Sequence, residues 1–185
     1  MGESVLSYTS SAVRDYPNLF TDGSWGSVRR KFDLLDGALP GNLISNINIV
    51  PFIGDKCIII RVASGEWEIP GGTLEPGETY LEAAHRELME EAGARLLTFK
   101  LFGAWLCHNP GEPFLPHLPH PDFYRVVGYG QVEIIGTPLN PEGGENIVSV
   151  ECVSIEEAAH RFHETGRPDL AELYRLAAIL ASSPY

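Results

Sequence analysis

One stretch, GGTLEPGETYLEAAHRELMEEAGARL at residues 71–96, constrains the fold more than any other part of this chain. It opens on a glycine-rich turn and continues as a helix that carries its own start and stop signals. Thr79 and Glu82 form a T-x-x-E capping box, in which side chains and backbone N–H groups of the first turn bond reciprocally. Gly93 stands where a helix commonly ends with a left-handed residue. These signals predict a helix between Thr79 and Gly93.

Three glutamates, Glu87, Glu90 and Glu91, crowd negative charge onto neighbouring positions of this helix. Like charges four residues apart oppose helix formation by a few tenths of a kcal/mol, and anions in the last turn oppose the helix dipole by roughly 0.3–1 kcal/mol each. Arg86 can steady Glu90 as an i,i+4 partner. Oxygen ligands at this density suit Mg²⁺ or Mn²⁺, whereas the simpler alternative is a solvated acidic helix face.

The spacing of the residues around these glutamates favours a metal site over a solvated acidic face. It resembles the signature of the Nudix hydrolases, the Nudix box, here Gly72–Ala94. Seven fixed residues and one aliphatic position match, an agreement expected by chance on the order of 10⁻⁸ per start position. The last position, normally Ile, Leu or Val, is Ala94, which is a packing position. The matching residues are Gly72, Glu78, Arg86, Glu87, Leu88, Glu90, Glu91 and Gly93.

The resemblance implies an α/β fold, the Nudix α/β/α sandwich with a mixed β-sheet. It also implies a MutT-like pyrophosphohydrolase, which cleaves the diphosphate of a nucleoside diphosphate derivative with Mg²⁺ or Mn²⁺. Carried over by position, the metal ligands are the Gly72 carbonyl and the carboxylates of Glu87, Glu90 and Glu91. Glu78 and Arg86 correspond to the structural pair that fixes the glycine-rich turn against the helix.

The family places its general base variably, either within the box or on a later loop. The expected catalytic residues are Glu87, Glu91 and Glu145. Glu87 is the candidate base within the box, and Glu145 is the first choice in the later acidic loop NPEGGEN, ahead of Glu142 and Glu151. A plain turn glutamate is the alternative for Glu145.

The rest of the chain predicts strands before and after the box and two closing helices. Residues 1–43 are expected to be an N-terminal extension with one short helix, Val28 to Leu35, and residues 44–185 the Nudix domain with a C-terminal helix. The expected strands are 43–52, 56–62, 65–72, 96–108, 123–135 and 146–154, and the closing helices 154–166 and 167–182.

Composition limits the partners and the compartment. The 185 residues suffice for one domain, and the net charge of −12 argues against a basic nucleic-acid surface. Cys57, Cys107 and Cys152 have no C-x-x-C spacing and are expected to be buried in a reducing compartment. Without an apparent signal peptide or membrane segment, the expected location is cytoplasmic. The expected partners are a small-molecule nucleotide and, optionally, a second copy of the chain in a homodimer.

The substrate is the least determined feature. Asn109-Pro110-Gly111 resembles the proline-glycine that ADP-ribose pyrophosphatases carry at about this distance from the box, which favours ADP-ribose or a nucleotide sugar over other nucleoside diphosphate derivatives. Pro110 and Arg61 are candidate substrate contacts, although Arg61 equally suits a surface ion pair. A non-catalytic nucleotide sensor of the same family is the alternative, and the retained glutamates argue against it.

The long segment NPGEPFLPHLPHPD, residues 109–122, predicts a functional loop. His117, His120 and Asp122, with His108 nearby, could be considered a zinc site. The prolines and the absence of helical spacing favour an exposed or substrate-contacting loop instead. Aromatic residues beside the loop are candidates for stacking on a nucleobase: Trp105, Phe114, Phe123 and Tyr124.

Overall fold

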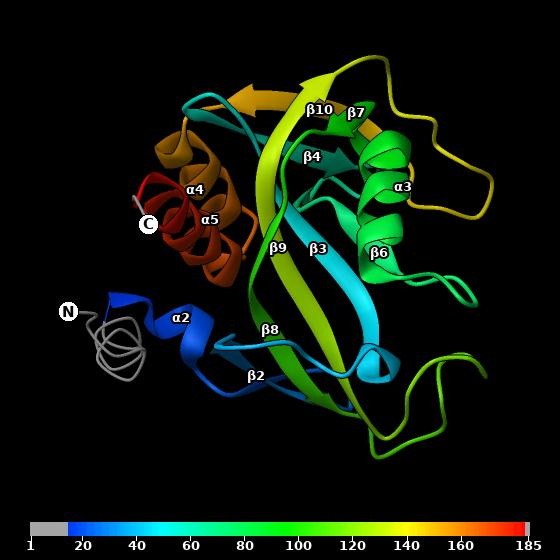
Figure 1. The fold of residues 1–185 in the computed structure, drawn as a ribbon. Helices are drawn as coiled ribbons and strands as arrows, with labels where there is room; N and C mark the ends of the chain where they lie inside the picture. The colour runs from blue at the N-terminus through cyan, green and yellow to red at the C-terminus, as the bar shows by residue number, and fades with distance from the viewer. Residues whose placement is uncertain (1–14, 184–185) are drawn as a thin grey trace.

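A central mixed sheet separates two helical layers in the computed structural model, which describes residues 15–183 (Figure 1). Helix α3 (Tyr80–Ala92) covers one face of the sheet, and helices α4 (Ile155–Glu164) and α5 (Pro168–Ser182) cover the other. The short helix α2 (Pro17–Phe20) packs beside α5. This arrangement confirms the predicted α/β/α sandwich with a mixed sheet.

The sheet is mixed because its two central strands, β3 and β9, run parallel, whereas the other neighbours run antiparallel. Three short strands pair at the sides of longer ones, β5 with β4, β6 with β3 and β7 with β9. A 3₁₀ turn, Gly41–Leu43, precedes β3. In spatial order the main strands are β1 (Gly23–Trp25), β2 (Val28–Leu34), β8 (Lys100–His108), β9 (Asp122–Ile134), β3 (Ile44–Ile53), β4 (Lys56–Val62) and β10 (Ile147–Val153). The short strands are β5 (Trp67–Glu68), β6 (Gly71–Thr73) and β7 (Ala94–Leu96).

The sheet divides between β3 and β4. These strands pair only at their turn, where Phe52 faces Cys57 and Ile53 faces Lys56. Farther along, β6 takes the edge of β3 and β5 takes the edge of β4, so each parent strand keeps its hydrogen bonds with a different short partner. The segment that joins β5 to β6 therefore passes from β4 to β3. It places the glycines at the start of the box where these two strands separate.

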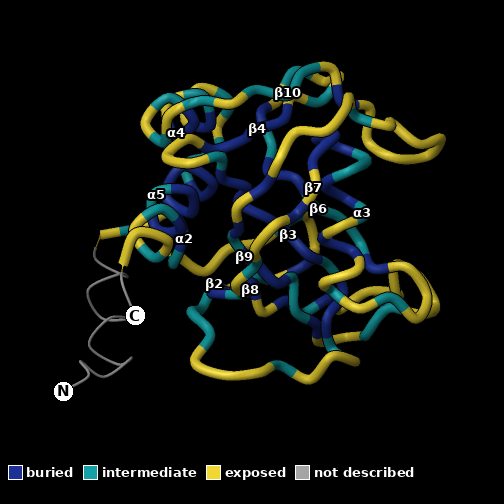
Figure 2. The backbone as a smooth tube through the Cα atoms, turned by 45° about the horizontal axis from the view of Figure 1, so that its top comes forward, coloured by how far each residue is buried: buried dark blue, intermediate teal, exposed yellow. Residues whose placement is uncertain are grey.

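Two apolar cores lie on the two faces of the sheet, and buried residues concentrate in its centre while the loops are exposed (Figure 2). The core under α3 includes Ile47, Ile58 and Leu88. The core under α4 and α5 is larger and rich in aromatic residues, and the Tyr174 hydroxyl donates to the Ile58 carbonyl at 3.0 Å. Burial of these side chains supplies most of the favourable free energy of folding.

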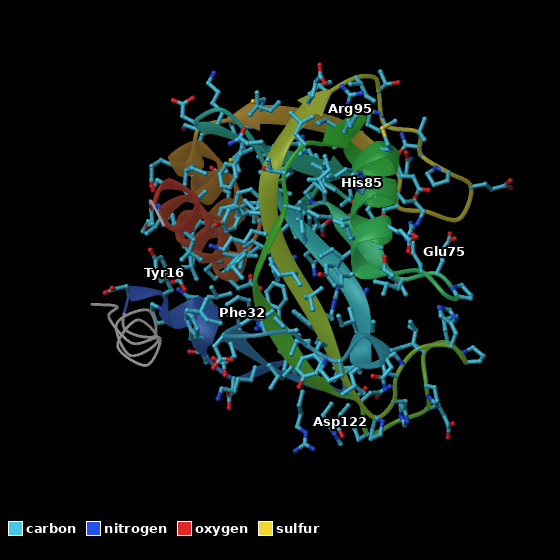
Figure 3. The ribbon with its side chains drawn as sticks, in the orientation of Figure 1. Tyr16, Phe32, Glu75, His85, Arg95 and Asp122 are labelled. Atoms are coloured by element: carbon cyan, nitrogen blue, oxygen red, sulfur yellow. The ribbon has the colours of Figure 1, made fainter. Side chains whose placement is uncertain are left out.

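The predicted helix over Val28 to Leu35 is wrong, because residues 28–34 form strand β2. This strand pairs with β8 from Arg29 opposite His108 to Leu34 opposite Gly103. Its inward positions alternate, and Phe32 packs against Phe20 of α2 with ring centroids 5.4 Å apart. Figure 3 labels Phe32 among the side chains of the sheet. Because the charged Arg30 occupies an inward position, the alternation of apolar and polar residues is not visible in the sequence. Pairing of this segment with a distant strand overrides its local helix propensity.

The described part of the predicted N-terminal extension, residues 15–43, thus adds α2, β1 and β2 to the same layers. The division of the chain at residue 43 stays a prediction. Cys57 and Cys107 are buried as expected, but Cys152 is exposed because it lies on β10, the outermost strand, and faces solvent. Among the described residues, no helix is both long and apolar enough to cross a bilayer.

Candidate active site

Arg86 fixes the glycine-rich turn of the box against α3. Its Nε and Nη2 atoms donate to the two carboxylate oxygens of Glu78 at 2.8 and 2.9 Å, and Nη2 also donates to the Thr73 carbonyl at 3.0 Å. Glu78 in turn accepts from the Glu75 N–H at 2.8 Å, on the loop that precedes α3 (Figure 3). A bidentate guanidinium–carboxylate pair is both strong and directional. The sequence-predicted pair Glu78 and Arg86 therefore lies in contact.

Arg86 also neutralises part of the acidic cluster. Its Nη1 atom donates to Glu87 at 2.8 Å and to Glu90 at 3.2 Å. Glu87 is buried, and burial raises the pKa of its carboxyl although Arg86 opposes that effect. A single arginine thus faces four glutamates, two of the box helix and two of the turn, so its one positive charge does not neutralise them.

Gly72 lies directly against Glu87. A Cβ atom built on Gly72 would sit 2.0 Å from Oε1 of Glu87, so only glycine lets the backbone of β6 approach this carboxylate. Strand β6 holds Gly72 in place by pairing it with Ile47 of β3. The Gly72 carbonyl and the Glu87 carboxylate, both predicted metal ligands, therefore come from adjacent residues in space.

We expect Gly72→Ala to displace Glu87 and to lower kcat on the order of 10²-fold, the cost of a misplacement of about 1 Å in a catalytic site. Gly37→Ala is the control, because a Cβ there meets no atom within 4 Å. Steady-state kinetics and thermal melting of both variants measure the effect. Equal activity in the two alanine variants would contradict the close packing of β6 on Glu87.

Glu91 is buried at the point where the sheet divides. Its Oε2 atom accepts from the Gly71 N–H at 2.8 Å, which ties α3 to the start of β6. Burial, together with the nearby charges of Glu87, Glu145 and Glu90, raises the pKa of Glu91 to about 8, and the bond from Gly71 only partly opposes the shift. A cation bound nearby would favour the charged form of this carboxyl and lower its pKa.

The loop from residue 135 to 146 carries Glu145 toward this cluster. It is anchored on the C-terminal carbonyls of α3, because Gly136 N–H donates to Gly93 at 3.1 Å and Leu139 N–H donates to Glu90 at 2.9 Å. The Asn140 side chain then closes the loop on Ile147 through bonds of 2.8 and 3.1 Å. In Figure 1 this loop runs alongside α3.

Glu145 lines a cavity of about 380 Å³, the box cavity, which also contacts Gly71. Its charge contributes to the raised pKa of Glu91, which places the two carboxylates in one electrostatic environment. The other candidate bases lie differently: Glu142 does not line the box cavity, and Glu151 forms an ion pair with Arg161 at 2.5 Å. The box cavity is lined by Trp25, Asn48, Glu68, Ile69, Gly71, Trp105, Arg125, Glu145, Arg167 and Leu170.

The donor chemistry of the cluster fits a hard divalent cation. Its members are carboxylates and a backbone carbonyl, the oxygen ligands that Mg²⁺ and Mn²⁺ prefer, and Gly72 brings its backbone directly against Glu87. Within residues 15–183 no three acidic, histidine or cysteine side chains converge in the arrangement of a metal site. Instead Arg86 holds Glu87 and Glu90, while Gly71 holds Glu91.

The two predicted substrate contacts lie apart from the acidic cluster. Arg61 is exposed on β4, donates to the Gly65 carbonyl at 3.1 Å and stacks over Trp67 at 5.6 Å. None of these contacts involves a box glutamate. Pro110 is exposed at the start of the loop between β8 and β9, where the buried Asn109 shapes the turn by accepting from the Gly111 N–H at 3.0 Å.

The histidines of the loop 109–121 do not gather into a zinc site. His108 pairs with Asp122 at 2.8 Å, His120 contacts the Gly111 carbonyl at 2.7 Å, and His117 contacts the Leu74 carbonyl at 2.9 Å. Leu74 belongs to the box turn. The contact of His117 with the Leu74 carbonyl therefore joins the long loop to that turn.

A second cavity, of about 330 Å³, lies under this loop, and we call it the loop cavity. Phe114 and Phe123 meet edge to face in its wall, with ring centroids 6.4 Å apart. Of the four aromatic residues predicted to stack on a base, these two line the loop cavity, Trp105 lines the box cavity, and Tyr124 lines neither. The loop cavity is lined by Trp25, Val28, Ser45, Asn46, Thr73, Phe114, Leu115, Leu118, Pro119, Phe123 and Arg125.

Trp25 and Arg125 line both cavities, and no motif or spacing in the sequence singles out either residue. The guanidinium of Arg125 stacks on the Trp25 ring at 4.7 Å, and that of Arg30 does so at 4.8 Å. An alternating strand at residues 28–34 would have placed Arg30 inward beside Val28 and Phe32. The position of Trp25 depends on pairing between distant segments.

The family model described as NUDIX domain matches residues 45–177. A solved NUDIX hydrolase from Nitrosomonas europaea has a TM-score of 0.56 at 22% identity and covers 77% of this chain and 92% of its own. The pyrophosphohydrolase BsRppH of Bacillus subtilis has a TM-score of 0.52 at 19% identity, covering 67% of this chain and 72% of its own. At these identities the likeness shows the fold alone.

Two curated relatives match shorter segments. An RNA pyrophosphohydrolase from Psychrobacter sp. (strain PRwf-1) is 36% identical over 64 residues, which is 33% of this chain and 37% of the relative. The 8-oxo-dGDP phosphatase NUDT18 of Homo sapiens is 46% identical over 43 residues, which is 21% of this chain and 13% of the relative. The matched segments thus span well under half of these relatives.

Proposed function

Because this chain belongs to the Nudix family, we propose that it is a metal-dependent pyrophosphohydrolase that cleaves the diphosphate linkage of a nucleoside diphosphate derivative. One observation carries the proposal: three glutamates cluster on α3, with Glu87 and Glu91 buried and Glu87 against the backbone of Gly72, and a single arginine pairs with two of them. Burial and the neighbouring carboxylates raise the pKa of Glu91 to about 8. A non-catalytic nucleotide sensor is the alternative, and it would not need three clustered carboxylates.

The proposed roles of the individual residues are as follows. Glu87, Glu90, Glu91 and the Gly72 carbonyl would hold Mg²⁺ or Mn²⁺, and Arg86 positions the first two. When bound, the metal polarises a phosphoryl oxygen and lowers the pKa of a water molecule. Glu145 would accept the proton of the attacking water from the loop that is anchored on α3, and Glu87 is the alternative base.

For the substrate we favour ADP-ribose or a nucleotide sugar. Asn109-Pro110-Gly111 resembles the proline-glycine of ADP-ribose pyrophosphatases, which supports this choice. The contact of His117 with Leu74 brings the loop that holds this tripeptide to the box. We further propose a cytoplasmic protein that acts on small nucleotides, alone or as a homodimer. The net charge of −12 disfavours an extended RNA surface.

The test is a panel of nucleoside diphosphate compounds incubated with Mg²⁺ or Mn²⁺ and scored for released phosphomonoesters. The panel includes ADP-ribose, nucleotide sugars, 8-oxo-dGDP and an RNA with a 5′-triphosphate. We expect hydrolysis of at least one small compound and, among them, preference for ADP-ribose or a nucleotide sugar. Tight binding of a nucleotide without any product would favour the sensor, and preferred cleavage of the RNA would overturn the small-molecule assignment.

Divalent metal is expected to stabilise the protein more strongly as pH rises. The pKa of Glu91 is about 8 in the folded protein and about 4.5 in the unfolded chain. This group therefore contributes stability fully below its unfolded pKa, and that contribution is lost as pH rises to about 8. Since the metal displaces the proton, its apparent affinity should grow over the same window.

Thermal-shift titrations of Mg²⁺ and Mn²⁺ at about pH 6, 7 and 8 measure this linkage, with EDTA as the reversal. We expect the metal-induced rise in Tm to increase from the lowest pH to the highest. A rise that is independent of pH would contradict a metal site built on a carboxyl with a raised pKa.

A further inference from the structure

Four polar side chains meet beside the box cavity on the sheet face that α5 covers. Register places Trp105 opposite Arg125 across β8 and β9, and places Arg30 opposite Cys107 across β2 and β8. Directly opposed residues, and those two positions away, share one face of a sheet, so Trp105, Arg125 and Arg30 project together. Trp25 of β1 packs among them, 5.5 Å from the Trp105 ring.

These side chains carry hydrogen-bond donors that nothing in the described residues satisfies. Four buried side-chain atoms within residues 15–183 lack a partner, and all four are N–H donors: Arg30 Nε, Arg30 Nη1, Arg125 Nε and Trp105 Nε1. No buried side-chain acceptor in the same range is unpaired. Buried donors without partners are costly, so a complementary ligand here has to supply acceptors.

Among the described residues, no carboxylate lies closer than 4.0 Å to the guanidinium of Arg30 or Arg125. The nearest described carboxylate to Arg30 is that of Asp169, at 4.0 Å, and Asp169 already accepts from Arg167 at 3.2 Å. Glu68, the other acid at this end of the box cavity, is paired with Arg167. The guanidinium of Arg125 stacks on the Trp25 ring, and the charges of Glu68 and Glu145 act on it from beyond ion-pair distance.

We propose that Arg125, Arg30 and the Trp105 indole form an oxyanion subsite, which binds a phosphate monoester or a carboxylate of the substrate. The subsite rests on the proposed function, because Arg125 and Trp105 line the box cavity together with Gly71 and Glu145. Charges of both signs line this cavity, Glu68 and Glu145 being acidic and Arg125 and Arg167 basic. A substrate with its diphosphate at the box and a further anion at its far end complements both.

The hairpin β1–β2 contributes Arg30 to this subsite and Trp25 beside it. Trp25 and Arg30 come from residues 23–34, which lie before the part of the chain that matches the family model. The hairpin is held in place by the pairing of β2 with β8 and by the stacking of Trp25 between two guanidinium groups. Preference for an anionic substrate end is thus a property that this chain adds to the common fold.

Direct binding tests the subsite without any reaction. Inorganic phosphate is titrated by calorimetry into the metal-free protein in EDTA, using the wild type, Arg125→Gln, Arg30→Gln and Arg29→Gln. Arg29 is the matched control, because it is exposed on the opposite side of β2. We expect both inward substitutions to weaken phosphate binding about 10- to 100-fold and Arg29→Gln to leave it unchanged. Equal affinity in all four proteins, or no phosphate binding by the folded wild type, would overturn the subsite.

Kinetics with matched substrates gives the second readout. UDP-glucose and UDP-glucuronate differ in one carboxylate, and NADH and NADPH differ in one phosphate. Arg125→Gln should lower kcat/KM about 10- to 100-fold for the anionic member of a pair and by no more than about threefold for the other. An equal loss for both members would overturn the assignment. Absence of hydrolysis by the wild type would count against the proposed function, while the phosphate titration still decides the subsite.

Discussion

Glu91→Gln is expected to lower kcat by about 10²- to 10⁴-fold while the protein stays folded, the loss of several kcal/mol of transition-state stabilisation by a metal. The substitution keeps the shape of the side chain and one carbonyl oxygen, so the bond from the Gly71 N–H can persist. It removes the charge that a divalent cation needs. Helix propensity barely differs between glutamate and glutamine, so α3 should form as before.

The same substitution should stabilise the protein when no metal is present. At about pH 8 the wild type must hold Glu91 partly ionised in a buried position near three other carboxylates, and glutamine avoids this cost. We expect a higher Tm for Glu91→Gln than for the wild type in EDTA, and a smaller rise on addition of Mg²⁺. Glu142→Gln, exposed on the later loop, is the control. Wild-type turnover in Glu91→Gln would contradict its role in holding the metal.

Glu145→Gln should cost about 10²–10⁴ in kcat if this residue is the general base. The 135–146 loop brings its carboxylate into the box cavity together with Gly71, and its charge acts on Glu91. The fold should not suffer, because Glu145 is exposed and the loop is held by backbone bonds to α3 and by Asn140. Glu142→Gln, three residues away on the same loop, should have little effect.

The comparison with Glu87→Gln identifies the base. Glu87 touches Gly72 and Arg86, so its loss damages the metal site whichever residue accepts the proton. The kcat of Glu145→Gln therefore distinguishes the two candidate bases, Glu145 and Glu87. The measurement is kcat at saturating substrate and metal, with changes in KM determined separately. Near-normal kcat in Glu145→Gln would remove this residue from the mechanism and return the role to Glu87.

The box helix could be predicted because its signals are local. The capping box between Thr79 and Glu82 is present, and Gly93 ends α3 with a φ of 60° as the sequence indicated. Such caps act within one turn of the helix and do not depend on the rest of the fold. The same holds for the pairing of Glu78 with Arg86, whose spacing the family signature already contains.

The cluster of Arg30, Trp105 and Arg125 could not be predicted, because it depends on strand pairing over long separations. Arg30 meets Trp105 and Arg125 only after β2 has paired with β8 and β8 with β9. In the sequence Arg30 stands among charged residues that suggest an exposed helix. Glu145 is intermediate: its glycine-rich surroundings indicated a loop, but only the bonds of residues 135–139 to α3 bring that loop to the box.

The central claim is that the box glutamates bind a divalent cation, and Mn²⁺ binding followed by electron paramagnetic resonance tests it most directly. The measurement compares the wild type, Glu90→Gln, Glu91→Gln and Glu142→Gln at about pH 8, with and without a non-hydrolysable nucleoside diphosphate analogue. We predict that the wild type and Glu142→Gln bind Mn²⁺ alike. Glu90→Gln and Glu91→Gln should each weaken binding at least about tenfold. Equal Mn²⁺ affinity in all four proteins, under both conditions, would contradict the assignment of the metal site to α3.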